Sequence, residues 1–112
     1  MKIFITGVAG FLGSHLADWF IERGHTVAGC DNMFGGEMVN VPAGVEFHQH
    51  DITVLDGYAE IMAGTDVVYH CAAAAYEGVS VFAPGFIADN IFTGSAVTIS
   101  AAIKAGVRRI VN

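Results

Sequence analysis

Residues 2–13 read KIFITGVAGFLG, an apolar segment followed by a turn with three spaced glycines. The run Ile3-Phe4-Ile5 does not alternate with polar residues, which is typical of a strand buried on both faces of a parallel sheet. A helix is expected to begin directly after the turn, at Phe11. The N–H groups at the start of such a helix are free and carry the positive end of its dipole. This order of strand, glycine turn and helix therefore predicts a phosphate-binding turn.

Each glycine has its own expected role. Gly7 lets the backbone turn sharply, Gly10 leaves room for a pyrophosphate, and Gly13 lets the helix pack closely on the strand. The G-x-x-G-x-x-G spacing differs from the standard G-x-G-x-x-G fingerprint, and spaced glycines also occur in loops that only need a flexible backbone. Asp31 favours a dinucleotide site, because it follows Gly13 by 18 residues. A carboxylate that binds an adenosine ribose lies at an offset of about 20 residues.

The composition describes one compact domain over residues 1–112. The chain is 54% hydrophobic and 14% charged, and it is long enough to bury a core of its own. No apolar run approaches the roughly 20 residues of a membrane span, and the first residues lack the features of a signal peptide. We therefore expect a cytoplasmic protein that does not bind a membrane.

The charge distribution bears on both partners and cofactor. Five Lys and Arg residues face eleven Asp and Glu residues, which gives a net charge of −6, and no Lys or Arg lies between Gly24 and Ile103. Nucleic-acid binding is not expected, since it needs a basic face that displaces counterions. The 2′-phosphate of NADP would require a nearby cation and would be repelled by Asp31, so NAD is the expected cofactor.

The pattern predicts an α/β fold of the Rossmann type, a doubly wound parallel sheet with strand order 3-2-1-4-5. The ligand crevice is then expected where the first and fourth strands meet. Ranges follow from the hydrophobic periodicity and the glycine positions. After the opening strand we expect strands at 25–31, 45–51, 66–71 and 107–112, helices at 11–23, 55–63 and 84–105, and a loop over 32–44.

The large apolar residues predict which face of each long helix is buried. In the first helix the expected core face consists of Leu12, Leu16, Trp19 and Phe20. In the 84–105 helix it consists of Ile87, Ile91, Ile99, Ala102 and Ile103. Asn90 is a polar exception on that face, and a buried amide must be hydrogen-bonded.

Cysteine and histidine residues suggest little reactive chemistry. Cys30 and Cys71 are expected to end strands about 9.5 Å apart, too far for a disulfide, and are predicted to be free thiols. His48 and His50 alternate with Glu46 on an outer strand. A zinc site usually needs three or four ligands in tetrahedral geometry, so a polar strand face is favoured over a metal site.

Several short segments along the sequence resemble those of a known family. The segment Thr6–Gly13, the pairs Asp31-Asn32 and Asp51-Ile52, the run His70–Ala73, and Asn90 are similar to successive landmarks of extended short-chain dehydrogenases/reductases. More narrowly, they resemble the N-terminal part of the NAD-dependent epimerase/dehydratase group that acts on nucleotide sugars. The resemblance implies these cofactor-binding residues: Gly7, Gly10, Phe11, Leu12, Gly13, Asp31, Asn32, Asp51, Ile52, Cys71, Ala72, Ala73 and Asn90.

The resemblance also implies roles for the later landmarks. The Asp51 carboxylate would meet the exocyclic amine of adenine, with Ile52 against the ring. Small side chains at 71–73 would let a flat cofactor ring approach the backbone; the alternative is that this alanine-rich segment starts a helix. Asn90 would lie beside the nicotinamide. Asn32 and Gly36 would lie near the adenosine ribose.

The catalytic pair of this family, Tyr-x-x-x-Lys, is absent. Tyr58, Tyr69 and Tyr76 are followed four residues later by Met, Ala and Ser. The resemblance therefore implies the cofactor-binding part of an enzyme, truncated before the later strands, the substrate domain and the catalytic residues. It also implies a nucleotide-sugar substrate for the complete enzyme and a homodimer packed through the 84–105 helix. The alternative is a stand-alone NAD-binding sensor without catalysis.

Other nucleotide-binding classes fit less well. The absence of G-K-[S/T] excludes a P-loop. A methyltransferase would also use a glycine turn and an acidic residue after the second strand, but it matches the Asp51-Ile52 pair and Asn90 less closely.

Overall fold

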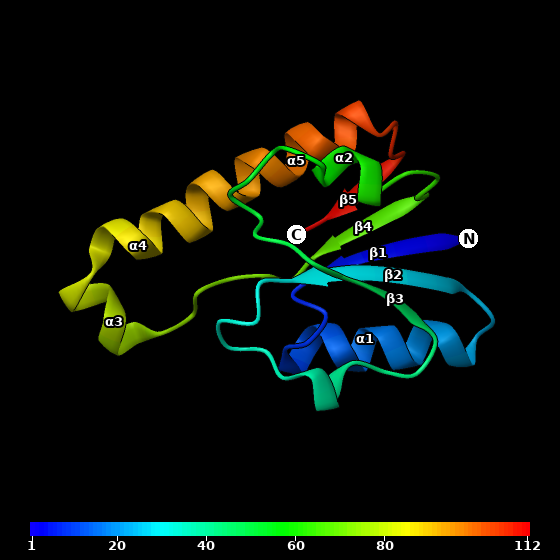
Figure 1. Cartoon of the computed structure of the whole chain (residues 1–112), viewed down its shortest axis with the longest axis horizontal. Coiled ribbons are helices and arrows are strands. Elements are labelled where there is room, and N and C mark those ends of the chain that lie inside the picture. The colour runs from blue at the N-terminus through cyan, green and yellow to red at the C-terminus, as the bar shows by residue number, and fades with distance from the viewer.

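The computed structural model describes all residues, 1–112, and shows one five-stranded parallel sheet in the order β3-β2-β1-β4-β5 (Figure 1). The strands are β1 (Lys2–Thr6), β2 (Thr26–Asp31), β3 (Val45–Gln49), β4 (Val67–His70) and β5 (Arg109–Val111). The predicted fold class and strand order are confirmed. Because β2 and β4 both pair with β1, the chain changes direction across the sheet at β1, which is where ligands bind in such folds.

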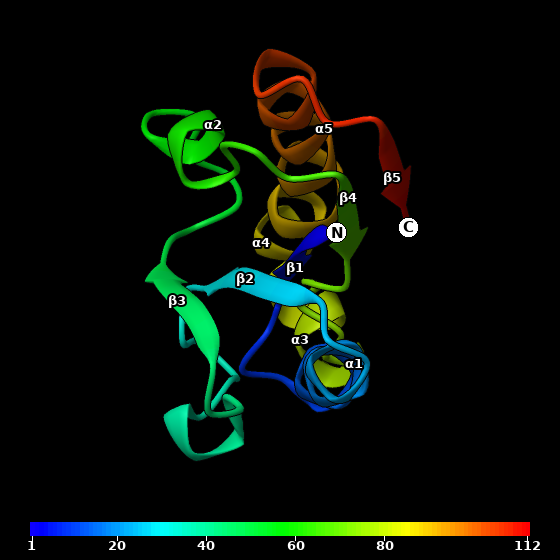
Figure 2. The ribbon, with the colours of Figure 1, turned by 90° about the vertical axis from the view of Figure 1, so that its right-hand side faces the viewer.

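Helices cover both faces of the sheet. They are α1 (Phe11–Glu22), α2 (Tyr58–Ile61), α3 (Glu77–Phe82), α4 (Pro84–Ala88) and α5 (Gly94–Lys104), with a short 3-10 helix η1 (Met38–Asn40) and a π-helical turn η2 (Asp89–Thr93). Helix α1 lies on one face, and α2 and α5 lie on the other (Figures 1 and 2). Helices α3 and α4 extend beyond the carboxyl ends of the strands (Figure 1). The separate helix α3 was not predicted, and α2 is shorter than the predicted 55–63.

The alternation of side chains along β1 divides the core in two. Ile3 and Ile5 pack with Ala17 and Phe20 of α1. Phe4 points to the other face and belongs to the cluster formed by α2 and α5. A strand whose neighbouring residues point into two separate cores must be apolar throughout, which explains the uninterrupted apolar run at the start of the chain.

The predicted core face of α1 is only partly correct. Phe20 is buried, but Leu12 and Trp19 are exposed, and the other buried residues of the helix are small: Gly13, Ser14 and Ala17. A Cβ atom on Gly13 would overlap the carbonyl oxygen of Gly7. The helix therefore lies so close to the glycine turn that small residues face the sheet near its start and large ones point away.

The predicted core face of the long helix is correct at Ala102 but wrong at its large residues, for the same reason. Ile91, Ile99 and Ile103 are exposed, whereas the buried residues of α5 are Gly94, Thr98, Ala101 and Ala102. A Cβ atom on Gly94 would lie 2.5 Å from Cδ1 of Ile52. Close packing on the sheet again selects small residues, and the large apolar side chains face outward.

The helical run Pro84–Lys104 also corrects the expectation that no segment approaches a membrane span. It has 21 residues, and its most apolar window has a mean hydropathy of 1.4, so its length and composition alone would allow it to cross a membrane. In this structure its second half, α5, packs on the sheet through Ala101 and Ala102.

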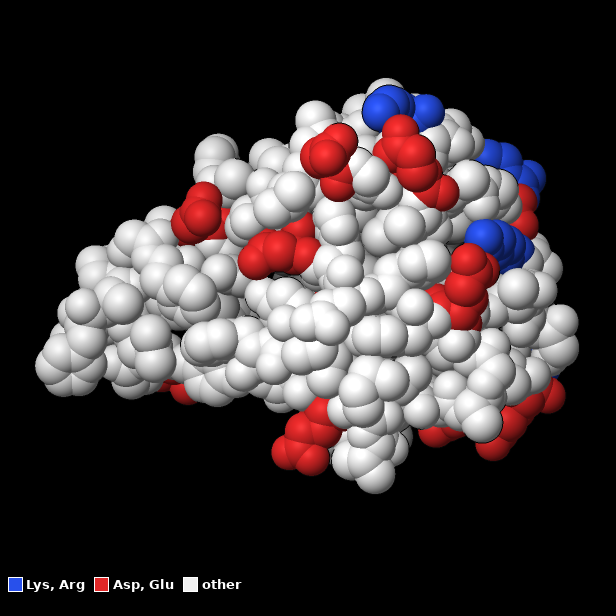
Figure 3. Space-filling model, viewed as in Figure 1, with Lys and Arg blue, Asp and Glu red and all other residues white.

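Positive charge is confined to one end of the molecule. The five cations lie at the amino-terminal ends of β1 and β5 or at the carboxyl ends of α1 and α5: Lys2, Arg23, Lys104, Arg108 and Arg109. On the face shown in Figure 3 the blue atoms gather toward one end, and the opposite end, formed by α3 and α4, is almost uncharged. The carboxyl ends of the strands therefore lie far from every Lys and Arg.

Candidate functional site

The glycine turn lies between the carboxyl end of β1 and the start of α1. Gly7 has a φ of +71°, and a Cβ atom there would lie 2.9 Å from the backbone N and Cα of Ala72. Only glycine suits both the dihedral angle and the close approach. At Gly10 the nearest atom to a Cβ would be the carbonyl oxygen of Gly7 at 3.2 Å. Gly10 is therefore the glycine of the turn with the most space in front of it.

Helix α1 begins without a cap. No side chain accepts its first N–H groups, and the backbone amides of Phe11 and Leu12 have no acceptor elsewhere in the chain. Both residues line the cleft in front of the turn. Unpaired amides at the positive end of a helix dipole bind anions, and the geometry here leaves them directed at the cleft.

Asp31 is a buried carboxylate, 7% exposed, at the end of β2. Its Oδ2 accepts the amide of Ala9 at 3.1 Å, and its Oδ1 accepts the amide of Met33 at 2.9 Å. A Cβ atom on Gly36 would lie 2.9 Å from Oδ2, so the loop after β2 closes tightly around this side chain. Each carboxylate oxygen keeps a further lone pair, and Asp31 lines the cleft.

One cleft brings together twelve of the thirteen residues proposed from the sequence as cofactor-binding. They are Gly7, Gly10, Phe11, Leu12, Gly13, Asp31, Asn32, Ile52, Cys71, Ala72, Ala73 and Asn90. They come from the carboxyl end of β2, the segments after β1, β2, β3 and β4, the first turn of α1, and the π-helical turn η2. No Lys or Arg lines the cleft.

Asp51 is the exception and lies outside the cleft lining. Its Oδ1 accepts the backbone N–H of Thr53 at 2.9 Å and the hydroxyl of Thr53 at 2.8 Å. Partial burial raises the pKa of Asp51, but the hydrogen bonds from Thr53, together with Asn32 and the nearby His50, hold this pKa below its ordinary value. In this structure the Asp51 carboxylate therefore stabilises the turn after β3.

Five residues of the cleft were missed by sequence reasoning: Phe34, Gly35, His50, Ala74 and Tyr76. Phe34 follows β2, yet its ring centroid lies 5.8 Å from that of Tyr76, which follows β4. It also lies 5.2 Å from the ring of Phe86 in α4. Because β2 and β4 flank β1, this aromatic contact joins the loops on either side of the glycine turn, and both rings line the cleft. Nothing in the local sequence of either loop indicates the pairing.

Residues 71–76 after β4 form no helix, so the alternative that residues 71–75 begin a helix is wrong. The hydroxyl oxygen of Thr6 accepts the amides of Cys71 at 3.1 Å and Ala72 at 3.0 Å. These bonds hold the alanine segment against the end of β1. The segment thereby presents backbone and methyl groups to the cleft.

The remaining candidates carry little chemistry. Cys30 and Cys71 are free thiols, and burial raises the pKa of Cys30 to about 12. No group of three His, Cys, Asp or Glu side chains is close enough to hold a metal ion. Asn90 is half-buried at the edge of the cleft, and its amide nitrogen lies 3.5 Å from the carbonyl oxygen of Phe86.

The chain matches a known protein family. Residues 3–112 match the model of the NAD dependent epimerase/dehydratase family. The chain belongs to this family. The epimerase/dehydratase family is NAD-dependent, in agreement with the cofactor expected from Asp31 and from the absence of cations.

Individual members of the epimerase/dehydratase family are similar over nearly the whole chain. UDP-glucose 4-epimerase of Streptomyces lividans is 36% identical over 113 residues, which cover 98% of this chain and 34% of the relative. The chain therefore spans about a third of the length of such curated relatives. A crystal structure of UDP-glucose 4-epimerase from Thermotoga maritima with UDP-glucose has a TM-score of 0.94 and 34% identity, and covers 98% of this chain and 36% of that one. The enzyme of Thermus thermophilus in complex with NAD has a TM-score of 0.90 and 33% identity, over 98% and 36%.

Proposed function

We propose that this chain is the NAD-binding part of a nucleotide-sugar epimerase or dehydratase. The observation that carries the proposal is the glycine turn with the unpaired amides of Phe11 and Leu12, faced by the buried carboxylate of Asp31 in one cleft. A dinucleotide needs an anion site after one strand and a carboxylate for the ribose at the end of the neighbouring strand.

The cleft fits NAD at its adenosine and diphosphate end. The glycines leave the space that side chains would fill, and the amides at the start of α1 take the diphosphate oxygens. Asp31 accepts the ribose hydroxyls with its remaining lone pairs, and Ile52 supports the adenine ring. Asp51 takes part only if its carboxylate turns away from Thr53.

The nicotinamide end rests on small residues. The extended segment Cys71–Ala73 leaves a flat surface for the ring, and Asn90 supplies an amide at the edge of the cleft. When bound, NAD would supply reversible hydride transfer with the sugar. The residues of this chain bind and orient the cofactor, and none of them is proposed as catalytic.

The distribution of charge supports NAD over NADP. The cleft has no Lys or Arg, and all five cations lie at the end of the molecule where the strands begin, opposite the carboxyl ends that form the cleft. A 2′-phosphate beside Asp31 would therefore meet a carboxylate and no counter-charge.

For the complete enzyme we propose a nucleotide-sugar substrate and an isomerase or lyase reaction, as in the relatives named above. We also propose a homodimer through the 84–105 helix. Ile91, Phe92, Ile99 and Ile103 are exposed along this helix, between 46% and 78% of their surface, and an apolar stripe of this kind favours burial against a second copy. The alternative of a stand-alone sensor gains no support from the comparisons.

Calorimetric titration with NAD, NADP and S-adenosylmethionine tests the proposal. We expect the wild-type chain to bind NAD, to bind NADP more weakly, and to lose NAD binding in Asp31→Ala. Equal affinity for NADP would refute the role of Asp31. Binding of S-adenosylmethionine instead of NAD would refute the proposed function.

A further inference from the structure

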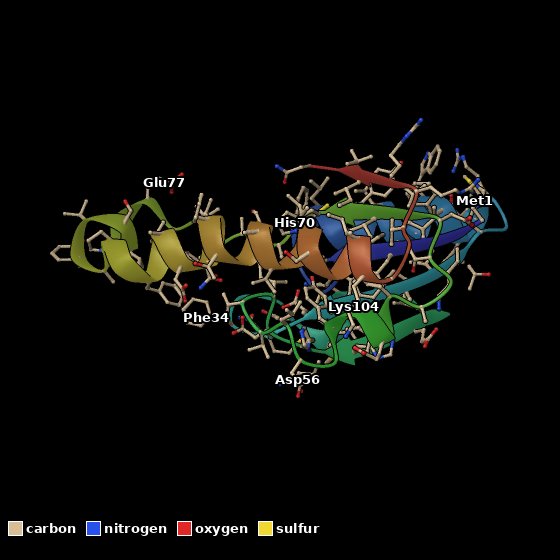
Figure 4. The ribbon with its side chains drawn as sticks, turned by 90° about the horizontal axis from the view of Figure 1, so that it is seen from above. Met1, Phe34, Asp56, His70, Glu77 and Lys104 are labelled. Atoms are coloured by element: carbon tan, nitrogen blue, oxygen red, sulfur yellow. The ribbon has the colours of Figure 1, made fainter.

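A line of hydrogen-bonded side chains connects β1, β4 and α5 behind the cleft. His70, the last residue of β4, has its Nδ1 2.8 Å from the hydroxyl of Thr6. Its Nε2 lies 3.0 Å from the hydroxyl of Ser95 in α5, and that hydroxyl lies 2.6 Å from the carbonyl oxygen of Ile91. Figure 4 shows His70 close to the long helix in the view from above.

The direction of every proton in this line follows from valence. A hydroxyl has one donor and two acceptor positions. The Thr6 hydroxyl oxygen already accepts the backbone amides of Ala72 at 3.0 Å and Cys71 at 3.1 Å, and the Cys71 amide also reaches the Thr6 carbonyl oxygen at 3.3 Å. Both lone pairs of the hydroxyl oxygen therefore face N–H donors. The Thr6 hydrogen must therefore point to Nδ1 of His70, which accepts it.

The rest of the line is then fixed. Since Nδ1 of His70 is an acceptor, the neutral ring carries its proton on Nε2 and donates it to the Ser95 hydroxyl. Ser95 in turn donates to the carbonyl of Ile91. A protonated imidazole would present an N–H to a Thr6 oxygen with no lone pair left. Burial also lowers the pKa of His70, which favours the neutral ring.

The line joins three walls of the cleft. Thr6 precedes Gly7, the first residue of the glycine turn. Cys71 and Ala72 form the wall after β4. Ile91 lies in the π-helical turn η2, next to Asn90. His70 is the only residue that contacts both the strand side and the helix side of this line.

We propose that His70, neutral and protonated on Nε2, is a positioning residue that holds the π-helical turn with Asn90 at a fixed distance from the glycine turn. This inference rests on the proposed function, because the groups it positions are those assigned to NAD. His70 itself does not line the cleft and touches no cofactor atom.

The first test is spectroscopic and needs no cofactor. A two-bond proton–nitrogen correlation spectrum of ¹⁵N-labelled protein at neutral pH, with His70 assigned by His70→Gln, should show Nε2 protonated and Nδ1 unprotonated. Thr6→Ser should keep this pattern, since it keeps the hydroxyl, and Thr6→Val, which removes the donor to Nδ1, should shift the Nδ1 resonance. A ring protonated on Nδ1 in the wild type would overturn the inference.

The second test measures NAD affinity in Ser95→Ala, Ser95→Thr and Ser100→Ala. Ser100 is a matched control, because its hydroxyl donates to the carbonyl four residues earlier in the same helix, at 2.8 Å, without contacting a histidine. We expect Ser95→Ala to weaken NAD binding about two- to tenfold, the worth of one hydrogen bond, while Ser95→Thr and Ser100→Ala bind as wild type.

The outcomes separate the two proposals. Wild-type affinity in Ser95→Ala, or equal weakening in Ser100→Ala, overturns the positioning role. A wild-type chain that fails to bind NAD overturns the proposed function and the positioning of cofactor groups with it. The spectrum still decides the proton arrangement in that case.

Discussion

The carboxylate of Asp31 accepts the backbone amide of Ala9 at 3.1 Å, so the end of β2 is fastened to the glycine turn that follows β1. The carbonyl of Ala9 is held as well, by the amide of Glu37 at 3.1 Å and the side chain of Asn40 at 3.1 Å. The residue proposed to bind the ribose therefore also shapes the diphosphate turn, and the two halves of the adenosine site depend on one side chain.

Asp31→Ala should lower stability as well as NAD affinity. It leaves the amides of Ala9 and Met33 without their charged acceptor, at about 1–3 kcal/mol for each buried donor. Asp31→Asn keeps one acceptor oxygen and should lose roughly half as much. Urea unfolding measures both variants. Equal stability of Asp31→Ala and wild type would contradict the structural role of the carboxylate.

Gly10→Ala should weaken NAD binding without unfolding the protein. Its Cβ lies at 3.2 Å from the nearest atom and enters the space in front of the turn, so we expect a folded protein with NAD affinity reduced at least about tenfold. Gly13→Ala should instead prevent stable folding, because its Cβ overlaps the Gly7 carbonyl. Gly78→Ala, with nothing near its Cβ, is the control. Thermal unfolding and NAD titration measure all three variants. Wild-type NAD affinity in Gly10→Ala, or wild-type stability in Gly13→Ala, would contradict the prediction.

Tyr58→Phe should destabilise the chain by about 1–3 kcal/mol. The Tyr58 hydroxyl is buried, lies 3.1 Å from the hydroxyl of Thr98, and accepts a hydrogen bond from the Cys30 thiol at 3.8 Å. Its removal leaves the buried Thr98 hydroxyl and Cys30 thiol without this partner. Tyr69→Phe is the matched control, because Tyr69 packs against Phe20 on the other face of the sheet and its hydroxyl is not part of the Cys30–Tyr58–Thr98 network. Denaturant unfolding compares them, and an equal loss in both would argue against the network.

Phe34→Ala should speed NAD dissociation about five- to tenfold, because it removes a ring that lines the cleft together with its contacts to Tyr76 and Phe86. Its stability should change little, since Phe34 is 61% exposed. Phe82→Ala removes a ring that is 89% exposed and lies outside the cleft, and it should release NAD as wild type does. A chase with excess unlabelled NAD gives the rates. Unchanged dissociation in Phe34→Ala would show that the contact does not retain cofactor.

The stability of the wild-type chain should fall as the pH drops below about 6.5. Burial lowers the pKa of His70 in the folded state, so in this range the unfolded state binds a proton that the folded state does not. Acid therefore favours unfolding until the pH reaches the folded pKa. His70→Gln should reduce the slope of stability against pH, whereas the exposed His15→Gln should keep it. The same slope in both variants would refute this assignment.

The strand order and the cleft could be predicted from the sequence because they depend on local patterns. An uninterrupted apolar run at Ile3–Ile5, three glycines at fixed spacing, and a carboxylate at the end of the next strand each report the geometry of their own neighbourhood. The carboxyl ends of parallel strands then meet at one edge, so the landmark residues converge without any further information.

The helix faces could not be predicted in the same way. Hydrophobicity places Leu12, Trp19 and Ile103 in a core, but closeness to the sheet decides in favour of Ala17 and Thr98. The contact between Phe34 and Tyr76 joins loops about forty residues apart, and Asp51 turns to Thr53 through a local turn that competes with the cleft. These features depend on distances between elements, which periodicity does not contain.

The π-helical turn Asp89–Thr93 makes the long helix sensitive to length. A π turn holds one residue more than the α-helix around it. Deleting one residue of α5 between this turn and Thr98 would rotate the preceding segment by about 100° against the rest of the helix. Thr98 would stay in place, and Asn90 would leave the edge of the cleft. The number of residues between Asn90 and Thr98 is thus as much a part of the recognition surface as the side chains themselves.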